Sequence, residues 1–289
     1  MIKQDNAEDI VRRATTAFNA GRHGEAVELC EHGLARQPGE PMLSHLLAAV
    51  LFARGEIAPA RKHVETSLAR RPDNAAARLL AARLARSSGE FGAALTHLDR
   101  AIALKPHRDA FVEKARTLEL AGRRAQAREA WEAIRKAIPE HQEANAQLGR
   151  MAWEDGDLAG AARLLERATA SAAPASVWFD LGVAKQDLRD HDGAACAYRK
   201  AIEIRPDYAE AALNLGIVLQ ESGELDAAMQ AFARAYALRA QLFGSIAMAL
   251  TSAPHGRLWL DERALRAALE HDPEKCEAVF RNDHAPTKG

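Results

Sequence analysis

The chain of 289 residues contains few aromatic residues, few cysteines and almost no excess of charge of either sign. Its three cysteines lie far apart and offer no paired spacing for zinc, which indicates a reducing compartment where disulfides are rare. The 39 basic residues nearly balance the 40 acidic ones, so the net charge of −1 argues against nucleic acid and anionic membranes as partners. No window approaches the roughly 18 apolar residues of a membrane span, and the first residues form no leader pattern. We therefore expect a cytoplasmic protein that does not enter a membrane.

Signatures of catalysis are also missing. The sequence contains no glycine-rich phosphate loop, no helix with paired metal-binding histidines and no nucleophile elbow. The triplet Asp190-His191-Asp192 has suitable chemistry, but it falls in a turn between two expected helices, where solvated polar residues are common. We accordingly expect no enzymatic activity, no cofactor and no metal.

A repeated spacing is the main feature that the sequence does contain. The stretch 175–207 carries, in order, a bulky residue, a Leu-Gly pair, a small residue, an aromatic, a second small residue and a proline: Trp178, Leu181, Gly182, Ala194, Tyr198, Ala201 and Pro206. These spacings place each half of the set on one face of a helix. Gly182 and Ala194 lack bulk, which lets the two helices approach closely, and Pro206 cannot continue a helix. The stretch therefore predicts a helical hairpin.

The same marks recur through most of the chain. Glycines at the turn between the two helices stand 33 or 34 residues apart, with an arginine in the sixth place: Gly21, Gly55, Gly89, Gly122, Gly156, Arg189 and Gly223. The prolines recur at similar intervals of 32 to 35 residues: Pro38, Pro72, Pro106, Pro139, Pro174 and Pro206. The sequence thus predicts seven units that begin near residues 7, 41, 75, 108, 142, 175 and 209. One hairpin cannot bury its apolar face alone, so the units must stack on one another.

This pattern resembles the tetratricopeptide repeat (TPR) family. The resemblance implies an all-α, right-handed α-solenoid superhelix of about seven helical hairpins with C-terminal capping helices. We expect a solenoid over 1–240, a helical cap or extension over 241–281 and a flexible tail over 282–289. The seventh unit lacks the closing proline, which predicts that its second helix runs on toward Leu250. A stripe of Leu242, Phe243 and Ile246 is expected to cover the open face of that unit.

The resemblance also implies that the first helix of each unit lines a concave groove. At 100° per residue, the second, fifth, ninth and twelfth residues of each unit face inward. Three consecutive ninth positions hold Arg83, Arg116 and Arg150, and Arg86 adds a charge one turn on. Inward positions near them are aromatic or apolar, and we assign Phe18, Phe52, Trp153 and His45 to the same binding surface.

Two readings of these positions stay open. The arginines contact a ligand, or they form ion pairs with neighbouring helices, with Glu119 as one acidic partner within the groove. Phe18 and Phe52 line the groove, or they only pack against an adjacent helix.

Asn214 stands just before a Leu-Gly pair, where some peptide-binding members of the family hold a ligand backbone with an asparagine amide. The resemblance implies the same role here, in the seventh repeat alone. The Lys/Asn/Arg set by which other members clamp a terminal carboxylate is absent from the sequence.

From these observations we expect a scaffold or adaptor that binds a segment of a partner protein or peptide, preferably acidic, in its concave groove. Two alternatives remain. The chain is an accessory subunit that docks to a separate enzyme through its C-terminal extension, or it is a helical-repeat RNA binder, for which binding with a steep dependence on salt is diagnostic.

Overall fold

The structure is a computed structural model that describes residues 6–252 and 262–270. Every regular element in these two ranges is helical, which confirms the all-α prediction. The chain divides into two compact units, one comprising residues up to 136 and the other beginning at residue 137, and we describe each by itself.

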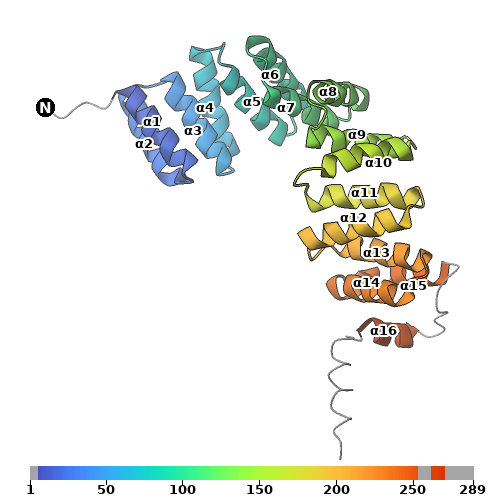
Figure 1. The fold of residues 1–289 in the computed structure, drawn as a ribbon. Helices are drawn as coiled ribbons and strands as arrows, with labels where there is room; N and C mark the ends of the chain where they lie inside the picture. The colour runs from blue at the N-terminus through green and yellow to red at the C-terminus, as the bar shows by residue number, and fades with distance from the viewer. Residues whose placement is uncertain (1–5, 253–261, 271–289) are drawn as a thin grey trace, which may run out of the picture. The chain divides into compact units, whose positions relative to one another are not determined.

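The first unit contains four helical hairpins (Figure 1). Their helices are α1 (Ala7–Asn19) with α2 (His23–Arg36), α3 (Pro41–Ala53) with α4 (Ile57–Arg70), α5 (Ala75–Ser87) with α6 (Phe91–Leu104), and α7 (Arg108–Leu120) with α8 (Arg124–Ala137). Each hairpin also contacts the next one along the chain, with α2 on α3, α4 on α5 and α6 on α7. One apolar cluster accordingly runs from α1 to α5 through the stacked hairpins, as a solenoid requires.

The second unit contains three further hairpins and a set of shorter helices. The hairpins are α9 (Gln142–Glu154) with α10 (Leu158–Thr169), α11 (Ala175–Asp187) with α12 (His191–Ile204), and α13 (Ala209–Glu221) with α14 (Leu225–Leu238). After them come the 3₁₀ helix η1 (Ala240–Leu242), α15 (Phe243–Ser252) and α16 (Glu262–Glu270). The division into a solenoid over 1–240, an extension over 241–281 and a tail over 282–289 stays a prediction.

The turn between the two helices of each hairpin contains one residue with left-handed backbone angles. Six of these residues are glycines with φ between 70° and 84°, a conformation that glycine adopts without steric cost. Arg189 occupies the equivalent place in the sixth hairpin and has φ 60°, as its position in the series predicts. Because its side chain opposes this conformation, the turn at Arg189 holds local strain.

The end of α14 differs from the prediction. The expectation that this helix runs on toward Leu250 is wrong, because α14 ends at Leu238 although no proline follows. Arg239 leaves the helix in an extended conformation, φ −150° and ψ 94°, close to that of Lys105 after α6, φ −152° and ψ 101°. The side chain of Arg239 forms an ion pair with Glu210 on α13, the first helix of the same hairpin. The ion pair of Arg239 with α13 therefore accompanies the end of α14, which falls at the same place in the repeat as in the other hairpins although no proline is present.

In the sixth and seventh hairpins, the close approach of the two helices relies on a glycine that has no side chain. A Cβ atom added at Gly182 on α11 would lie 2.5 Å from a ring carbon of Tyr198 on α12, and Tyr198 is fully buried. Gly216 and Phe232 repeat this arrangement in the next hairpin, also at 2.5 Å. The pairing of a glycine with a large ring therefore fixes the separation of the helices, as the sequence predicts.

The last hairpin is covered by both short helices. Ile246 and Leu250 of α15 and Leu265 and Leu269 of α16 are buried in the same apolar cluster as Phe232. Leu242 and Phe243 pack against that cluster, which confirms the predicted stripe. Helix α15 contacts α13, and α16 contacts α14. The sequence also predicts a helix N-cap at Asp261 and a short helix that starts at Asp272-Pro273, and both lie outside the described residues.

Candidate partner-binding surface

First helices of neighbouring hairpins touch one another throughout the first unit and between the first two hairpins of the second. Helix α1 contacts α3, α3 contacts α5 and α5 contacts α7, while α9 contacts α11 in the second unit. The ninth residue of each hairpin is half-buried in all seven cases: Thr15, Ala49, Arg83, Arg116, Arg150, Val183 and Ile217. These residues are therefore packed between neighbours yet keep part of their surface open to a ligand.

In the first unit, three predicted arginines converge on one carboxylate. Arg83 donates from Nε to Oε1 of Glu113 at 3.0 Å, and Nη2 of Arg86 lies 3.2 Å from Oε2. Arg116, one turn along α7 from Glu113, places Nη1 3.4 Å from Oε1. We call Arg83, Arg86 and Arg116 the arginine cluster. Arg83 and Arg86 thus form ion pairs with a neighbouring helix, and Arg116 forms one within its own helix; contact of these arginines with a ligand stays a prediction.

The Glu113 carboxylate is buried, whereas the three arginine side chains are partly exposed. The Glu113 side chain is 6% exposed, whereas those of Arg83, Arg86 and Arg116 are 35%, 27% and 41% exposed. A buried carboxylate must be paired, and here three guanidinium groups share that task. Each of the three arginine side chains thus keeps part of its surface open to solvent, and Glu119 lies half-buried on the same helix as Glu113. The arrangement positions several charged donors side by side.

In the second unit, Arg150 follows the same rule as Arg83. Its Nη1 lies 3.3 Å from Oδ2 of Asp180, and both this pair and Arg83–Glu113 join residues 30 positions apart. Each pair links the ninth residue of one hairpin to the sixth residue of the next. Burial raises the pKa of Asp180 above its usual range, while the nearby guanidinium of Arg150 opposes that shift. The arginine ladder expected from the sequence is therefore described as one cluster in the first unit and one pair in the second.

Trp153 is an exposed aromatic residue that is held in position. It is 40% exposed, and its indole Nε1 donates a hydrogen bond to Oδ2 of Asp187 on α11 at 2.6 Å. An aromatic side chain that is fixed before binding loses little conformational entropy when a partner covers it. Trp153 thus has the properties of a preformed anchor.

The other predicted residues near the N-terminus are more deeply packed. Phe18 and Phe52 are half-buried against apolar clusters, and the ring of Phe18 lies 5.5 Å from that of His23 in a tilted contact. His45 is also half-buried, and burial lowers the pKa of its imidazole. Packing accounts for the larger part of each of these three side chains, and each keeps a partly open edge.

Asn214 has an internal partner. Its amide nitrogen donates to the hydroxyl of Tyr198 at 3.3 Å, and that hydroxyl donates to Gln186 at 2.8 Å. Burial raises the pKa of the Tyr198 phenol, which therefore stays protonated near neutral pH. To hold a ligand backbone through its amide N–H, Asn214 must share that group with Tyr198.

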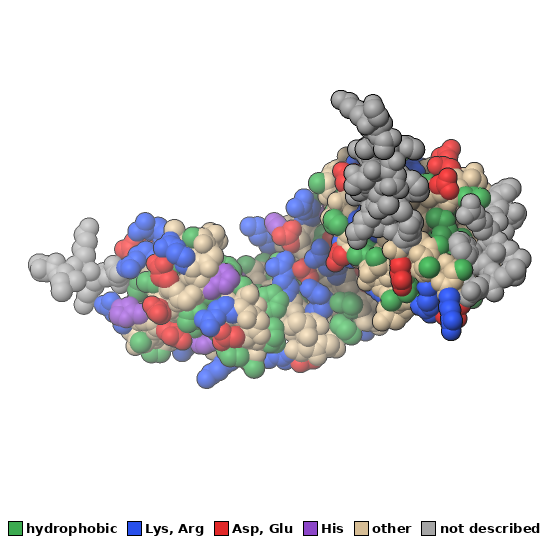
Figure 2. All heavy atoms as spheres, turned by 90° about the horizontal axis from the view of Figure 1, so that it is seen from below, with side chains coloured by type: hydrophobic (Ala, Val, Ile, Leu, Met, Phe, Trp, Pro, Cys, Tyr) green, Lys and Arg blue, Asp and Glu red, His purple; other side chains and the backbone are tan. Residues whose placement is uncertain are grey.

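Within residues 6–252 and 262–270, no three histidine, cysteine or acidic side chains gather closely enough to hold a metal ion. The described helices include none with the length and apolar character needed to cross a bilayer. Asp190 caps α12 by accepting from the backbone of Gly193 at 3.0 Å and pairs with Lys185 at 3.3 Å. The face drawn in Figure 2 shows hydrophobic, basic and acidic side chains intermixed over the described residues.

Comparison with protein families identifies the repeats. Models described as tetratricopeptide repeat match residues 17–84, 51–113, 112–176 and 209–246, and one described as TPR repeat matches residues 187–223. Together they extend over most of the chain. The chain belongs to the tetratricopeptide repeat family.

Solved structures share the fold at low sequence identity. A chain of the APC/C hetero-tetramer Cut9–Hcn1 matches with a TM-score of 0.63 and 16% identity over 86% of this chain, which spans 50% of that protein. PilF of Pseudomonas aeruginosa matches with a TM-score of 0.63 and 15% identity, covering 69% of this chain and 92% of its own. The type IV pilus biogenesis factor PilW has a TM-score of 0.63 and 16% identity, with 74% and 98% covered. A search of the curated proteins found no match.

Proposed function

We propose that the protein is a scaffold that binds a segment of a partner protein along the exposed faces of its first helices. Its membership of a family of stacked helical hairpins supports an interaction role in general. The part that is specific to this chain is the recognition of acidic side chains by the arginine cluster in the first unit. This role requires no catalytic group or cofactor in the chain itself. We further propose that the protein acts in the cytoplasm.

The observation that carries the proposal is the convergence of Arg83, Arg86 and Arg116 on the single buried carboxylate of Glu113. Glu113 orients the guanidinium groups and keeps them partly desolvated before any ligand arrives. A carboxylate of the partner then meets donors whose orientation is already fixed, so binding costs less entropy than it would with mobile surface arginines. The cluster therefore favours a segment with closely spaced acidic residues.

The second unit supplies a different kind of contact. Trp153 offers an exposed ring, and the ninth positions of the next two hairpins, Val183 and Ile217, are apolar and half-buried. Arg150 is largely neutralised by Asp180. We infer that this unit contacts apolar side chains of the partner, with Trp153 as the main anchor.

The experiment captures partners from a lysate of the native organism on the immobilised full chain and quantifies them by mass spectrometry. The variant R83Q/R86Q/R116Q removes the charged donors, and R36Q/R70Q/R71Q removes the same charge from exposed positions at the ends of α2 and α4. Each charged hydrogen bond contributes about 1.5–3 kcal/mol, so the first variant is expected to bind its partners at least about 100-fold more weakly. The control variant should bind normally. Equal capture by both variants would refute acidic recognition at the arginine cluster.

A further inference from the structure

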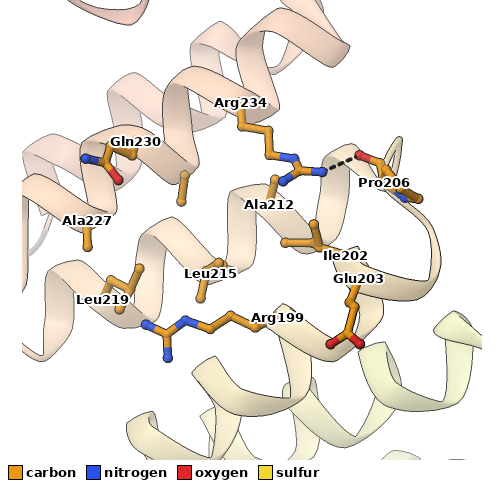
Figure 3. Close-up of a pocket in the computed structure, with 11 residues that line it drawn as sticks. Arg199, Ile202, Glu203, Pro206, Ala212, Leu215, Leu219, Ala227, Gln230 and Arg234 are labelled. Atoms are coloured by element: carbon orange, nitrogen blue, oxygen red, sulfur yellow. Dashed lines mark hydrogen bonds between the residues drawn. The ribbon is translucent and has the colours of Figure 1, made fainter. Parts of the chain in front are cut away.

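A second surface lies between the sixth and seventh hairpins, on the side of the second helices. It is a groove of about 670 Å³ enclosed by α12, α13 and α14 (Figure 3). Ile202, Leu215 and Leu219 form its apolar floor, and Arg199 and Arg234 flank it. This groove is separate from the first-helix faces and does not depend on the function proposed for them.

The equivalent groove between the third and fourth hairpins provides a comparison. It has a volume of about 490 Å³ and is lined by residues at mostly the same places in the repeat. There Lys114 stands at the seventh position of its hairpin and pairs with Asp99 on α6 at 2.7 Å, which closes the floor with an ion pair. The groove in the second unit has Leu215 and Arg199 at these two places. Its floor is thus apolar, and a cation, Arg199, stands where the first-unit groove has the carboxylate of Asp99.

The fourth residue of the hairpin explains why the second-unit groove is open. In the sixth hairpin this position holds Trp178, which packs half-buried against apolar clusters on both sides. In the fourth it holds Phe111, which lines the groove compared above. The seventh hairpin has only Ala212, which is fully buried at the base of the groove. The groove therefore lacks the large aromatic side chain that Trp178 supplies in the sixth hairpin and Phe111 in the fourth.

The charged residues at the rim of the groove determine which partner groups can bind beside the apolar floor. Glu203 is paired with Lys200 at 2.7 Å, and Arg234 donates to the backbone oxygen of Pro206 at 2.8 Å (Figure 3). Arg199 is exposed, extends alongside Leu215 and Leu219, and forms no ion pair or hydrogen bond with the part of the chain that the structure describes. The rim consequently presents one uncompensated positive charge next to the apolar floor.

We propose that this groove docks a partner segment that inserts one large aromatic side chain over Leu215 and places an acidic residue against Arg199. The aromatic group replaces the side chain that Ala212 lacks, and the acidic residue supplies the charge that Asp99 supplies in the first unit. The occupant is thus a second protein segment of aromatic and acidic character, held on the opposite side of the hairpins from the first-helix surface.

The test uses the full chain with labelled isoleucine, leucine and alanine methyl groups, observed by NMR. The probe is a seven-residue peptide with one tryptophan followed by two glutamates. Shifts of the methyl signals of Ile202, Leu215 and Leu219 are expected during its titration. Replacement of the tryptophan by alanine should weaken binding at least about tenfold, because burial of such a side chain is worth roughly 1.5–3 kcal/mol. Replacement of both glutamates by lysines should weaken it about threefold, the size of an exposed ion pair.

Two variants make the test specific. Ala212→Trp fills the groove from within and should abolish the methyl shifts, whereas R199E, an exposed change that leaves the packing intact, should reverse the preference between the glutamate and lysine peptides. Unchanged preference in R199E, or no methyl shifts at millimolar peptide in the unaltered chain, would overturn the proposal. A concentration-dependent dimer in sedimentation that A212W suppresses would also overturn it, because the occupant would then be a second copy of this chain.

Discussion

Replacement of Gly182 by alanine tests the packing that sets the spacing of the helices. The new Cβ would lie 2.5, 2.6 and 2.9 Å from three ring carbons of Tyr198, about 1 Å inside ordinary carbon contact. Tyr198 has little freedom to move, because it is fully buried and its hydroxyl bonds both Gln186 and Asn214. Overpacking costs about 1–3 kcal/mol, and this site belongs at the upper end. The higher helix propensity of alanine offsets about 1 kcal/mol of this cost, so G182A should lower the free energy of unfolding by about 2 kcal/mol.

Urea unfolding of the full chain, followed by circular dichroism and by tryptophan fluorescence, measures this loss. Gly24→Ala and Gly92→Ala serve as matched controls, because a Cβ at either position meets no atom within 4 Å in a helix. They should be as stable as the original chain or gain up to about 1 kcal/mol. If G182A unfolds at the same urea concentration as these controls, the glycine–tyrosine contact does not limit the approach of the helices.

Three further predictions concern a turn, the C-terminal cover and a buried histidine. Arg189→Gly should stabilise the chain by about 0.5–1 kcal/mol by relieving a left-handed arginine, and a lower melting temperature would contradict this. A chain ending at Ala240 exposes the apolar face of the last hairpin and should lose stability and solubility; ending at Thr251 should also cost stability, since it removes the buried Leu265. Because burial lowers the pKa of His45, the unfolded chain takes up its proton first, and stability should fall as pH drops below the usual value of 6.5. His45→Leu should flatten thermal melts recorded between pH 7.5 and pH 5.5, and an unaltered slope would exclude this contribution.

The repeat was readable from the sequence because each hairpin uses local rules. Spacings within one helix, the residue at the turn and the proline after the second helix act over fewer than 34 residues, and they even identified Arg189 as a substitute for glycine. The prediction for the end of α14 was wrong because no proline marks it. There the residue after the helix, Arg239, pairs instead with Glu210 on α13.

The partners of the arginines were missed for a related reason. Arg83 pairs with Glu113 and Arg150 with Asp180 across the boundary between hairpins, 30 residues apart, whereas the helical period relates only residues within one helix. The sixth position was considered only as a place for asparagine. An acidic residue at that position, 30 residues after an arginine, was the signal that could have found both pairs.

The central claim is that the arginine cluster divides its donors between Glu113 and an acidic partner. Glu113→Gln removes the internal competitor while keeping a side chain that accepts a hydrogen bond, so it separates stability from binding. The measurement is the dissociation constant of a fluorescent hexaglutamate peptide by anisotropy at 50 mM salt, with a thermal melt of the same sample. Tighter binding by about threefold or more, together with a lower melting temperature, is the predicted result. Weaker or unchanged binding in a folded E113Q chain would contradict the account.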